Sequence, residues 1–215
     1  MSPTNKRRTV LVFAKAPRPG LAKTRLVPLL GAEGAAALHA KLVKRTLETA
    51  RRAGLGDLEL HGEPADDDFL RFCAERYGAR LVPQAAGDLG DRMCVAVQQV
   101  LETCAYAILV GSDCPALTAR HLRSAAKALE DGSDAVFVPA EDGGYALVGL
   151  ARCDARLFQG VAWSTPRVME ETRNRLTTLG WKWQELETLW DVDTAGDYAR
   201  LAASGLLERA GKPPK

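Results

Sequence analysis

The chain has 215 residues, of which 47% are hydrophobic and 26% are charged, a balance that argues against an intrinsically disordered protein. Its formal net charge of +2 is too small to indicate nucleic acid as a partner. The five cysteines are odd in number and include no C-x-x-C pair, which argues against a disulfide framework and a zinc site. His39, His61 and His121 have no chemical cluster around them in the sequence, and we expect them on the surface or on helices.

A chain of this length fits one α/β domain better than two. We expect a flexible lead-in at residues 1–8, one domain at residues 9–204 and a tail at residues 205–215. No run of about 18 apolar residues and no signal-peptide pattern is present, so we expect a cytoplasmic protein without membrane insertion. The sequence indicates no oligomeric state.

Short apolar runs alternate with helical patterns along the chain. Runs of strand length lie at residues 9–14, 57–61, 79–82, 106–110, 134–138 and 182–187. Helical patterns lie at residues 31–53, 65–77, 121–130 and 165–180, with one more that ends near residue 103 and a short one after residue 194. Thr165 and Pro166 are expected to be the cap and the first residue of their helix. This alternation predicts a mostly parallel sheet with helices on both faces.

A loop rich in cations follows the first predicted strand. It reads K-A-P-R-P-G-L-A-K-T-R-L and leads toward a helix, the usual position of a phosphate site. It matches neither the Walker A pattern nor G-x-G-x-x-G. We therefore expect the side chains of Lys15, Lys23 and Arg25 to bind a di- or triphosphate by their charge. The alternative is a solvated basic loop that pairs with surface acids.

A single carboxylate, Asp113, follows the apolar run at residues 106–110 in the motif V-G-S-D-C-P-A-L. Open α/β sheets place ligand chemistry at the carboxyl ends of their strands. We expect Asp113 to hold a divalent metal. The alternative is that it shapes the turn and caps the next helix.

Two glycine turns also follow predicted strands. In G-D-L-G-D-R-M, Gly87 and Gly90 allow the close approach of a base or ribose, although Asp88 or Asp91 can equally be a helix cap. The second turn, P-A-E-D-G-G-Y, fits a simple hairpin. If this turn faces the predicted metal site, Asp142 is placed to orient an acceptor or to act as a base.

The last acidic motif is D-V-D-T at residues 191–194. In an extended segment, Asp191 and Asp193 point to the same side. Asp113 and Asp193 can then share one hard cation, Mg²⁺ or Mn²⁺, with water and phosphate oxygens as the remaining ligands.

Together these motifs resemble a bacterial family of GT-A-type transferases in the nucleotide-diphospho-sugar transferase superfamily. The resemblance covers residues 9–200 and rests on five motifs in the same order: F-A-K-A-P-R-P-G-L-A-K-T-R-L, G-D-L-G-D-R-M, V-G-S-D-C-P-A-L, E-D-G-G-Y-A-L-V-G and D-V-D-T-A-G-D-Y. The family is similar to 2-phospho-L-lactate guanylyltransferase and molybdenum cofactor guanylyltransferase, and some members are labelled glycosyltransferases. The resemblance implies a single three-layer α/β/α GT-A domain with a mostly parallel sheet.

The resemblance also implies site residues and a cofactor. By motif match, the phosphate loop carries Lys15, Lys23 and Arg25, the base-proximal loop carries Gly87, Asp88 and Gly90, and the metal positions are Asp113 and Asp193. The implied cofactor is Mg²⁺ or Mn²⁺. The chain departs from related transferases in two places: a loop with proline and lysine replaces G-x-G, and S-D-C, with one carboxylate, replaces D-x-D.

The expected function is a metal-dependent transferase with Asp113, Lys23 and Asp142 as catalytic residues. The first hypothesis is glycosyl transfer from a nucleotide-sugar donor to a small-molecule acceptor, with Asp142 as the base. The alternative is nucleotidyl transfer from a nucleoside triphosphate to a phosphorylated acceptor, with release of pyrophosphate. A non-catalytic nucleotide-binding module is the second alternative.

Overall fold

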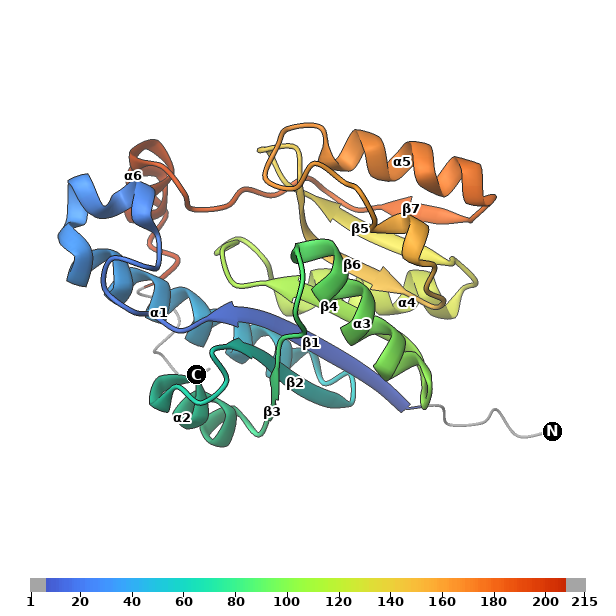
Figure 1. Ribbon diagram of the computed structural model, residues 1–215, viewed down its shortest axis with the longest axis horizontal. Coiled ribbons are helices and arrows are strands. Elements are labelled where there is room, and N and C mark those ends of the chain that lie inside the picture. Colours follow the sequence, from blue (N-terminus) through green and yellow to red (C-terminus); the bar gives the residue numbers. More distant parts are fainter. Residues whose placement is uncertain (1–6, 208–215) are drawn as a thin grey trace.

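The computed structural model describes residues 7–207 (Figure 1). Most of the lead-in expected at residues 1–8 and most of the tail expected at residues 205–215 therefore lie outside the described residues. The first strand, β1 (Arg7–Lys15), already begins at Arg7. The expected domain bounds remain predictions.

Strands and helices alternate along the described chain. The strands are β1 (Arg7–Lys15), β2 (Asp57–Glu63), β3 (Arg80–Pro83), β4 (Cys104–Gly111), β5 (Ala135–Pro139), β6 (Tyr145–Leu150) and β7 (Trp183–Glu185). The helices are α1 (Val27–Ala53), α2 (Asp68–Tyr77), α3 (Leu89–Leu101), α4 (Ala119–Glu130), α5 (Val168–Leu179) and α6 (Ala195–Ser204), with short 3₁₀ helices η1 (Thr24–Leu26) and η2 (Ala155–Leu157). Most predicted elements are present with ends shifted by a few residues.

The seven strands form one sheet in the order β3-β2-β1-β4-β6-β5-β7. β6 runs antiparallel to both of its neighbours, and all other strand pairs are parallel. The antiparallel strand follows from the short E-D-G-G turn, because a hairpin joins antiparallel strands whereas parallel strands need a longer crossover. The prediction of a mostly parallel sheet is confirmed.

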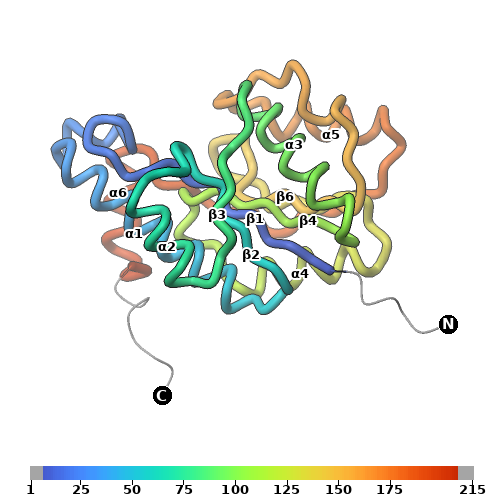
Figure 2. The backbone as a smooth tube through the Cα atoms, turned by 60° about the horizontal axis from the view of Figure 1, so that its bottom comes forward, coloured from blue at the N-terminus to red at the C-terminus, as the bar shows by residue number. Residues whose placement is uncertain are grey.

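The sheet lies between two layers of helices, as Figure 2 shows: α3 and α5 cover one face, and α1, α2 and α4 cover the other. The central strand β1 is apolar from Val10 to Ala14 because both of its faces are buried there. Val10 and Val12 contact the core on the α1 side, and Leu11 and Phe13 contact the core on the α3 side. A third apolar cluster joins α1 to α6. The three-layer α/β/α prediction is confirmed.

Two local predictions are wrong. α5 begins at Val168, not at Thr165, because Ser164 adopts a left-handed conformation (φ 62°) and the Thr165 hydroxyl donates to the carbonyl of Ala162. The second concerns His61, which is buried on strand β2, neither on the surface nor on a helix; His39 and His121 are also buried, but they lie on α1 and α4 as expected. Their burial is explained by polar partners, such as the Glu59 carboxylate for His61, 2.8 Å from Nε2.

One helix of the described chain, Thr24–Ala53, is long and apolar enough to cross a membrane by length and composition. This is a weak indication, because the core helix of a folded domain passes the same test. Here Val43 and Leu47 of α1 are fully buried against the sheet, and Gly31 interrupts the helical backbone with φ 70° and ψ 166°.

The turn between β5 and β6 is packed against the segment before α5. Gly143 has φ +90°, and a Cβ atom at this position would lie 2.1 Å from the carbonyl oxygen of Pro166. Its own carbonyl accepts a hydrogen bond from the amide of Met169. The turn therefore needs glycine for two reasons, the backbone angle and the close approach.

We expect Gly143→Ala to lower the free energy of unfolding by about 1–3 kcal/mol more than Gly132→Ala. Gly132 is the matched control, because it has φ +98° but no atom within 4 Å of an added Cβ. Both variants carry the cost of the left-handed angle, and only Gly143→Ala adds the collision. Chemical denaturation measures the difference; equal losses in the two variants would contradict the packing described here.

Candidate functional site

The carboxyl ends of β1, β4 and β5 meet at one edge of the sheet, since these strands run in the same direction. The segment between β7 and α6 crosses this edge, as Figure 1 shows. Two backbone hydrogen bonds hold it there: Glu141 N donates to Leu189 O (2.9 Å), and Val192 N donates to Asp113 O (3.0 Å). Asp113 and Asp193, far apart in sequence, are thereby brought to one place.

A cavity of about 640 Å³ opens at this edge, a size typical of small-molecule sites. We call it the strand-end cavity. Its charged lining residues are Lys15, Lys23, Arg25, Arg92, Asp113 and Asp193. The structure thus brings together five of the predicted site residues, from three separate motifs.

Lys23 lies at the centre of the charged groups. Its Nζ is 2.7 Å from Asp113 Oδ1, and it donates a hydrogen bond to Asp193 Oδ1 at 2.9 Å. The Lys23 side chain is 4% exposed, whereas the side chains of Asp113 and Asp193 are 43% and 42% exposed. Burial acts to lower the pKa of Lys23, but the two carboxylates outweigh it and the pKa is raised. Lys23 is therefore a buried, charged bridge between two half-exposed carboxylates.

Backbone strain also marks the strand-end cavity. Among the described residues, Lys23 (φ 50°) and Ser164 (φ 62°) are the only non-glycine residues with positive φ. Both of them line this cavity. A left-handed conformation costs an ordinary residue about 1–2 kcal/mol, and such strain is typical of functional sites.

Two buried polar atoms at this edge have no hydrogen-bond partner among the described residues, His39 Nδ1 and Asp191 Oδ1, and a third, Asp113 Oδ1, has only its ion pair with Lys23. The His39 Nε2 atom faces the carbonyl oxygen of Lys15 at 3.0 Å and must donate its proton there. Burial lowers the pKa of His39 and favours its neutral form, in which Nδ1 then carries a lone pair. Nδ1 lies 3.8 Å from Asp113 Oδ1, so two electron-rich atoms face each other. The Lys23 ammonium lies against Asp113 Oδ1, so His39 Nδ1 is the atom of the two that is left without a donor.

Asp191 is a third carboxylate, close enough to Asp113 and Asp193 for their charges to affect it. Burial, together with the neighbouring charges of Asp113 and Asp142, raises the pKa of Asp191 to about 7. It therefore keeps its proton over much of the pH range in which an ordinary aspartate is ionised. Sequence alternation already predicts that it lies on the same side as Asp193.

The remaining predicted residues do not line the strand-end cavity. Asp88 caps α3, where its Oδ1 accepts a hydrogen bond from Asp91 N at 2.9 Å and Asp91 reciprocates. Its neighbours Gly87 and Gly90 shape the same turn, and of this turn only Leu89 reaches the cavity lining. Asp142 is exposed and accepts a hydrogen bond from Gly144 N at 2.9 Å within the β5–β6 turn.

Sequence reasoning did not single out several cavity residues, and four of them bear on the chemistry of the site. His39 contributes from α1, and its spacing of three and four residues from Leu42 and Ala35 is the signal that it lies on the buried helix face. Arg92 pairs with the Glu63 carboxylate and donates from Nε to Gly87 O at 3.0 Å.

Leu21 and Leu89 complete the missed set. They are 69% and 44% exposed, two of the five large exposed apolar side chains of the described chain, and both line the strand-end cavity. Apolar residues inside otherwise polar turns are the sequence signal that was available.

The donors at the strand-end cavity fit a hard divalent cation. Carboxylate oxygens are the ligands that Mg²⁺ and Mn²⁺ prefer, and Asp113 and Asp193 each present a half-exposed carboxylate beside the Lys23 ammonium. However, the described residues contain no group of three or more acidic, histidine or cysteine side chains arranged to hold a metal. The residues therefore fit a cation that takes its other ligands from a bound phosphate and from water.

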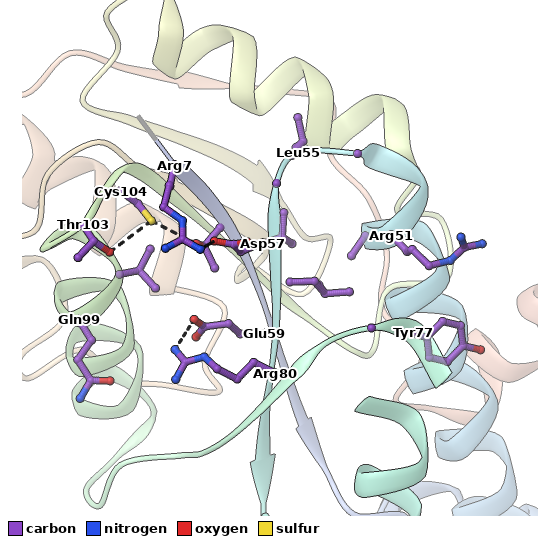
Figure 3. Close-up of a pocket in the computed structure, with 18 residues that line it drawn as sticks. Arg7, Arg51, Leu55, Asp57, Glu59, Tyr77, Arg80, Gln99, Thr103 and Cys104 are labelled. Atoms are coloured by element: carbon purple, nitrogen blue, oxygen red, sulfur yellow. Dashed lines mark hydrogen bonds and ion pairs between the residues drawn. The ribbon is translucent and has the colours of Figure 1, made fainter. Parts of the chain in front are cut away.

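A second cavity, of about 550 Å³, lies at the opposite edge, where β1, β2, β3 and β4 begin (Figure 3). Its charged groups are paired: Arg7 contacts Asp57 at 3.1 Å, Arg80 contacts Glu59 at 2.5 Å, and Arg51 contacts Glu48, outside the lining, at 3.0 Å. No predicted site residue lines it. With these charges paired, it offers less to an anionic ligand than the strand-end cavity does.

Solved structures of other proteins have a similar fold. A candidate nucleotide-diphospho-sugar transferase from Desulfovibrio desulfuricans G20 is 27% identical, with a TM-score of 0.80 over 94% of this chain and 97% of that one. A cytidylyltransferase from Leptospira borgpetersenii serovar Hardjo-bovis is 14% identical, with a TM-score of 0.60 over 94% and 87% of the two chains.

A third similar structure is glucosyl-3-phosphoglycerate synthase from Mycobacterium tuberculosis, in complex with Mn²⁺, UDP and glucosyl-3-phosphoglycerate. It is 13% identical, with a TM-score of 0.52 over 98% and 82% of the two chains. No curated protein matches the chain by sequence. These likenesses confirm the predicted GT-A fold.

A family model described as "Uncharacterized protein conserved in bacteria (DUF2064)" matches residues 46–165, more than half of the chain. The chain therefore belongs to the DUF2064 family, within the nucleotide-diphospho-sugar transferase superfamily that its motifs predict.

Proposed function

We propose that this protein is a transferase that binds a nucleotide and moves a group between it and a small-molecule acceptor. The observation that carries the proposal is the set of charges in the strand-end cavity, where Lys15 and Arg25 accompany the bridge from Lys23 to Asp113 and Asp193. Lys15 and Arg25 are exposed, and no carboxylate of the described residues lies within ion-pair distance of either. Their charges are free to bind phosphates.

The reaction that this geometry supports best is nucleotidyl transfer. An oxygen of a phosphorylated acceptor attacks the α-phosphorus of a nucleoside triphosphate and forms the new P–O bond. The bond from the α-phosphorus to the bridging oxygen breaks, and pyrophosphate leaves with that electron pair. The attacking phosphate is already ionised near neutral pH, so positioning and charge neutralisation suffice. This suits a cavity rich in cations whose expected base, Asp142, is bonded within its own turn.

Each charged residue then has a role in this reaction. Lys15 and Arg25 bind the phosphates that become pyrophosphate, and Lys23 neutralises the charge that develops as they leave. Asp113 and Asp193 hold Mg²⁺ or Mn²⁺, which supplies further positive charge to the phosphates when it is bound. The apolar side chains of Leu21 and Leu89 offer a surface to the flat face of the base beside the Gly87–Gly90 turn.

Glycosyl transfer is the second candidate, and the likeness to the Desulfovibrio desulfuricans protein favours it. In that reaction an acceptor hydroxyl attacks the anomeric carbon, the carbon–oxygen bond to the diphosphate breaks, and a nucleoside diphosphate leaves. The hydroxyl must lose its proton, and Asp142 is the residue proposed to accept it. A move of the β5–β6 turn toward the strand-end cavity is then required.

The leaving group distinguishes the two reactions. The protein is incubated with each nucleoside triphosphate, a panel of phosphorylated acids and sugars, and Mg²⁺, and pyrophosphate is measured. A second series uses nucleotide-sugars and measures the free nucleoside diphosphate. Pyrophosphate release that depends on an acceptor supports nucleotidyl transfer, and nucleoside diphosphate release supports glycosyl transfer. Nucleotide binding without either product would indicate that the protein is a non-catalytic nucleotide-binding module.

A further inference from the structure

The carboxylates proposed to hold a metal already share one cation of the chain itself. The Lys23 ammonium lies within 3 Å of an oxygen from each of them, and its side chain is almost fully buried beneath them. Among the described residues, the only other basic group within ion-pair distance of either carboxylate is His39, 3.8 Å from Asp113 Oδ1. An ammonium and a divalent cation compete for the same oxygens, because each needs their negative charge at short range.

The carboxylates also outnumber the ammonium. Asp113 and Asp193 both lie within ion-pair distance of the single Lys23 ammonium, so the three groups carry one net negative charge with Lys23 in place and two without it. Withdrawal of Lys23 from Asp113 and Asp193 leaves two half-exposed carboxylates without a counter-ion. A divalent cation from solution then restores the balance of charge.

We propose that Lys23 is a built-in counter-ion that keeps divalent cations out of this site until a nucleotide phosphate draws its ammonium away. The inference rests on the proposed function, since it takes the nucleotide's phosphates to be the group that attracts Lys23. It goes beyond that function because it makes metal binding conditional on the nucleotide. Lys23 combines a strained left-handed backbone with a side chain that is only 4% exposed.

Two features of the structure predict that nucleotide binding and metal binding favour each other. Lys23 lines the same cavity as Lys15 and Arg25, so phosphates bound by those two residues occupy the cavity that Lys23 also faces. The described residues also supply no three-ligand metal site, so phosphate oxygens are needed to complete the shell. By linkage, a phosphate that recruits the metal is itself bound more tightly when the metal is present.

The test measures Mn²⁺ binding to the ligand-free protein by the loss of the free-ion electron paramagnetic resonance signal. We expect Lys23→Met to bind Mn²⁺ more tightly than the unaltered protein by about tenfold or more. Lys15→Met is the matched control: it removes the same charge from the same cavity, but Lys15 contacts neither carboxylate, and we expect it to change Mn²⁺ affinity far less. The double variant Lys23→Met with Asp113→Asn should lose the gain in Mn²⁺ affinity that Lys23→Met alone produces.

Equal Mn²⁺ affinities for the unaltered protein and Lys23→Met would overturn the proposal. A weaker affinity in Lys23→Met would also overturn it, since Lys23 would then be holding the carboxylates in place for the metal. If Lys23→Met does not fold, the Mn²⁺ affinity of Lys23→Gln is measured in its place, since glutamine keeps a hydrogen-bond donor without the charge. An equal or a weaker affinity than that of the unaltered protein would again overturn the proposal. No nucleotide takes part in this test, so its failure is separate from a failure to detect transferase activity.

Discussion

Replacing Asp113 with asparagine is expected to lower the turnover number of nucleotide-dependent transfer by about 10²–10³-fold, the usual cost of removing one preorganised electrostatic group from an active site. The substitution keeps the size of the side chain but removes the negative charge that faces Lys23 Nζ at 2.7 Å. One of two carboxylates proposed to hold the metal is lost. Acceptor-dependent pyrophosphate release at saturating nucleotide and Mg²⁺ measures the effect.

The fold should survive this change. The contact that ties Asp113 to the segment before α6 is made by its backbone carbonyl, which accepts from Val192 N, and the substitution leaves it intact. Near-ultraviolet circular dichroism checks the packing. Asp131→Asn is the control, since Asp131 is exposed and pairs only with Lys127 on α4. Near-normal turnover in Asp113→Asn with Mg²⁺ would show that the metal assignment is wrong.

The sheet could be predicted because burial leaves a direct trace in the sequence. The apolar run at residues 9–14 belongs to the central strand, where both faces are covered, so nearly every position is apolar. Asp113 could be singled out for a related reason: one carboxylate follows a buried run, and parallel strands bring such ends to one edge. The prediction used only local patterns and a general rule of sheet geometry.

The finer arrangement of the site depends on contacts that no local pattern encodes. The motif K-T-R-L predicts Lys23 as a phosphate ligand, but nothing in it signals the left-handed backbone of Lys23 or its burial between two carboxylates from distant segments. His39 was missed because its partners, the Lys15 carbonyl and Asp113, lie on other elements. The sequence allows Asp88 to be either part of a nucleotide-binding turn or a helix cap. In the structure its side chain accepts a hydrogen bond from Asp91 N, as a helix cap does.

Replacing Asp191 with asparagine is expected to stabilise the protein at pH 8 much more than at pH 5. The pKa of Asp191 is about 7 in the folded protein, against 3.8 for the free side chain. Between these values the folded state holds a proton that the unfolded state has lost, so the free energy of unfolding falls as pH rises. Each pKa unit corresponds to about 1.4 kcal/mol, so the variant should gain about 2–3 kcal/mol more at pH 8 than at pH 5.

Chemical denaturation in a chelator, at both pH values, measures this gain without interference from metal ions. Asp197→Asn provides a contrast of opposite sign, because Thr194 N and its hydroxyl donate to the Asp197 carboxylate and the pKa of Asp197 is lowered despite partial burial. Loss of that carboxylate should destabilise the protein at pH 8. A loss of stability in Asp191→Asn at both pH values would mean that the Asp191 carboxylate is held by favourable contacts. In that case the three acidic side chains around Lys23 would not repel one another enough to make the cluster a cation site.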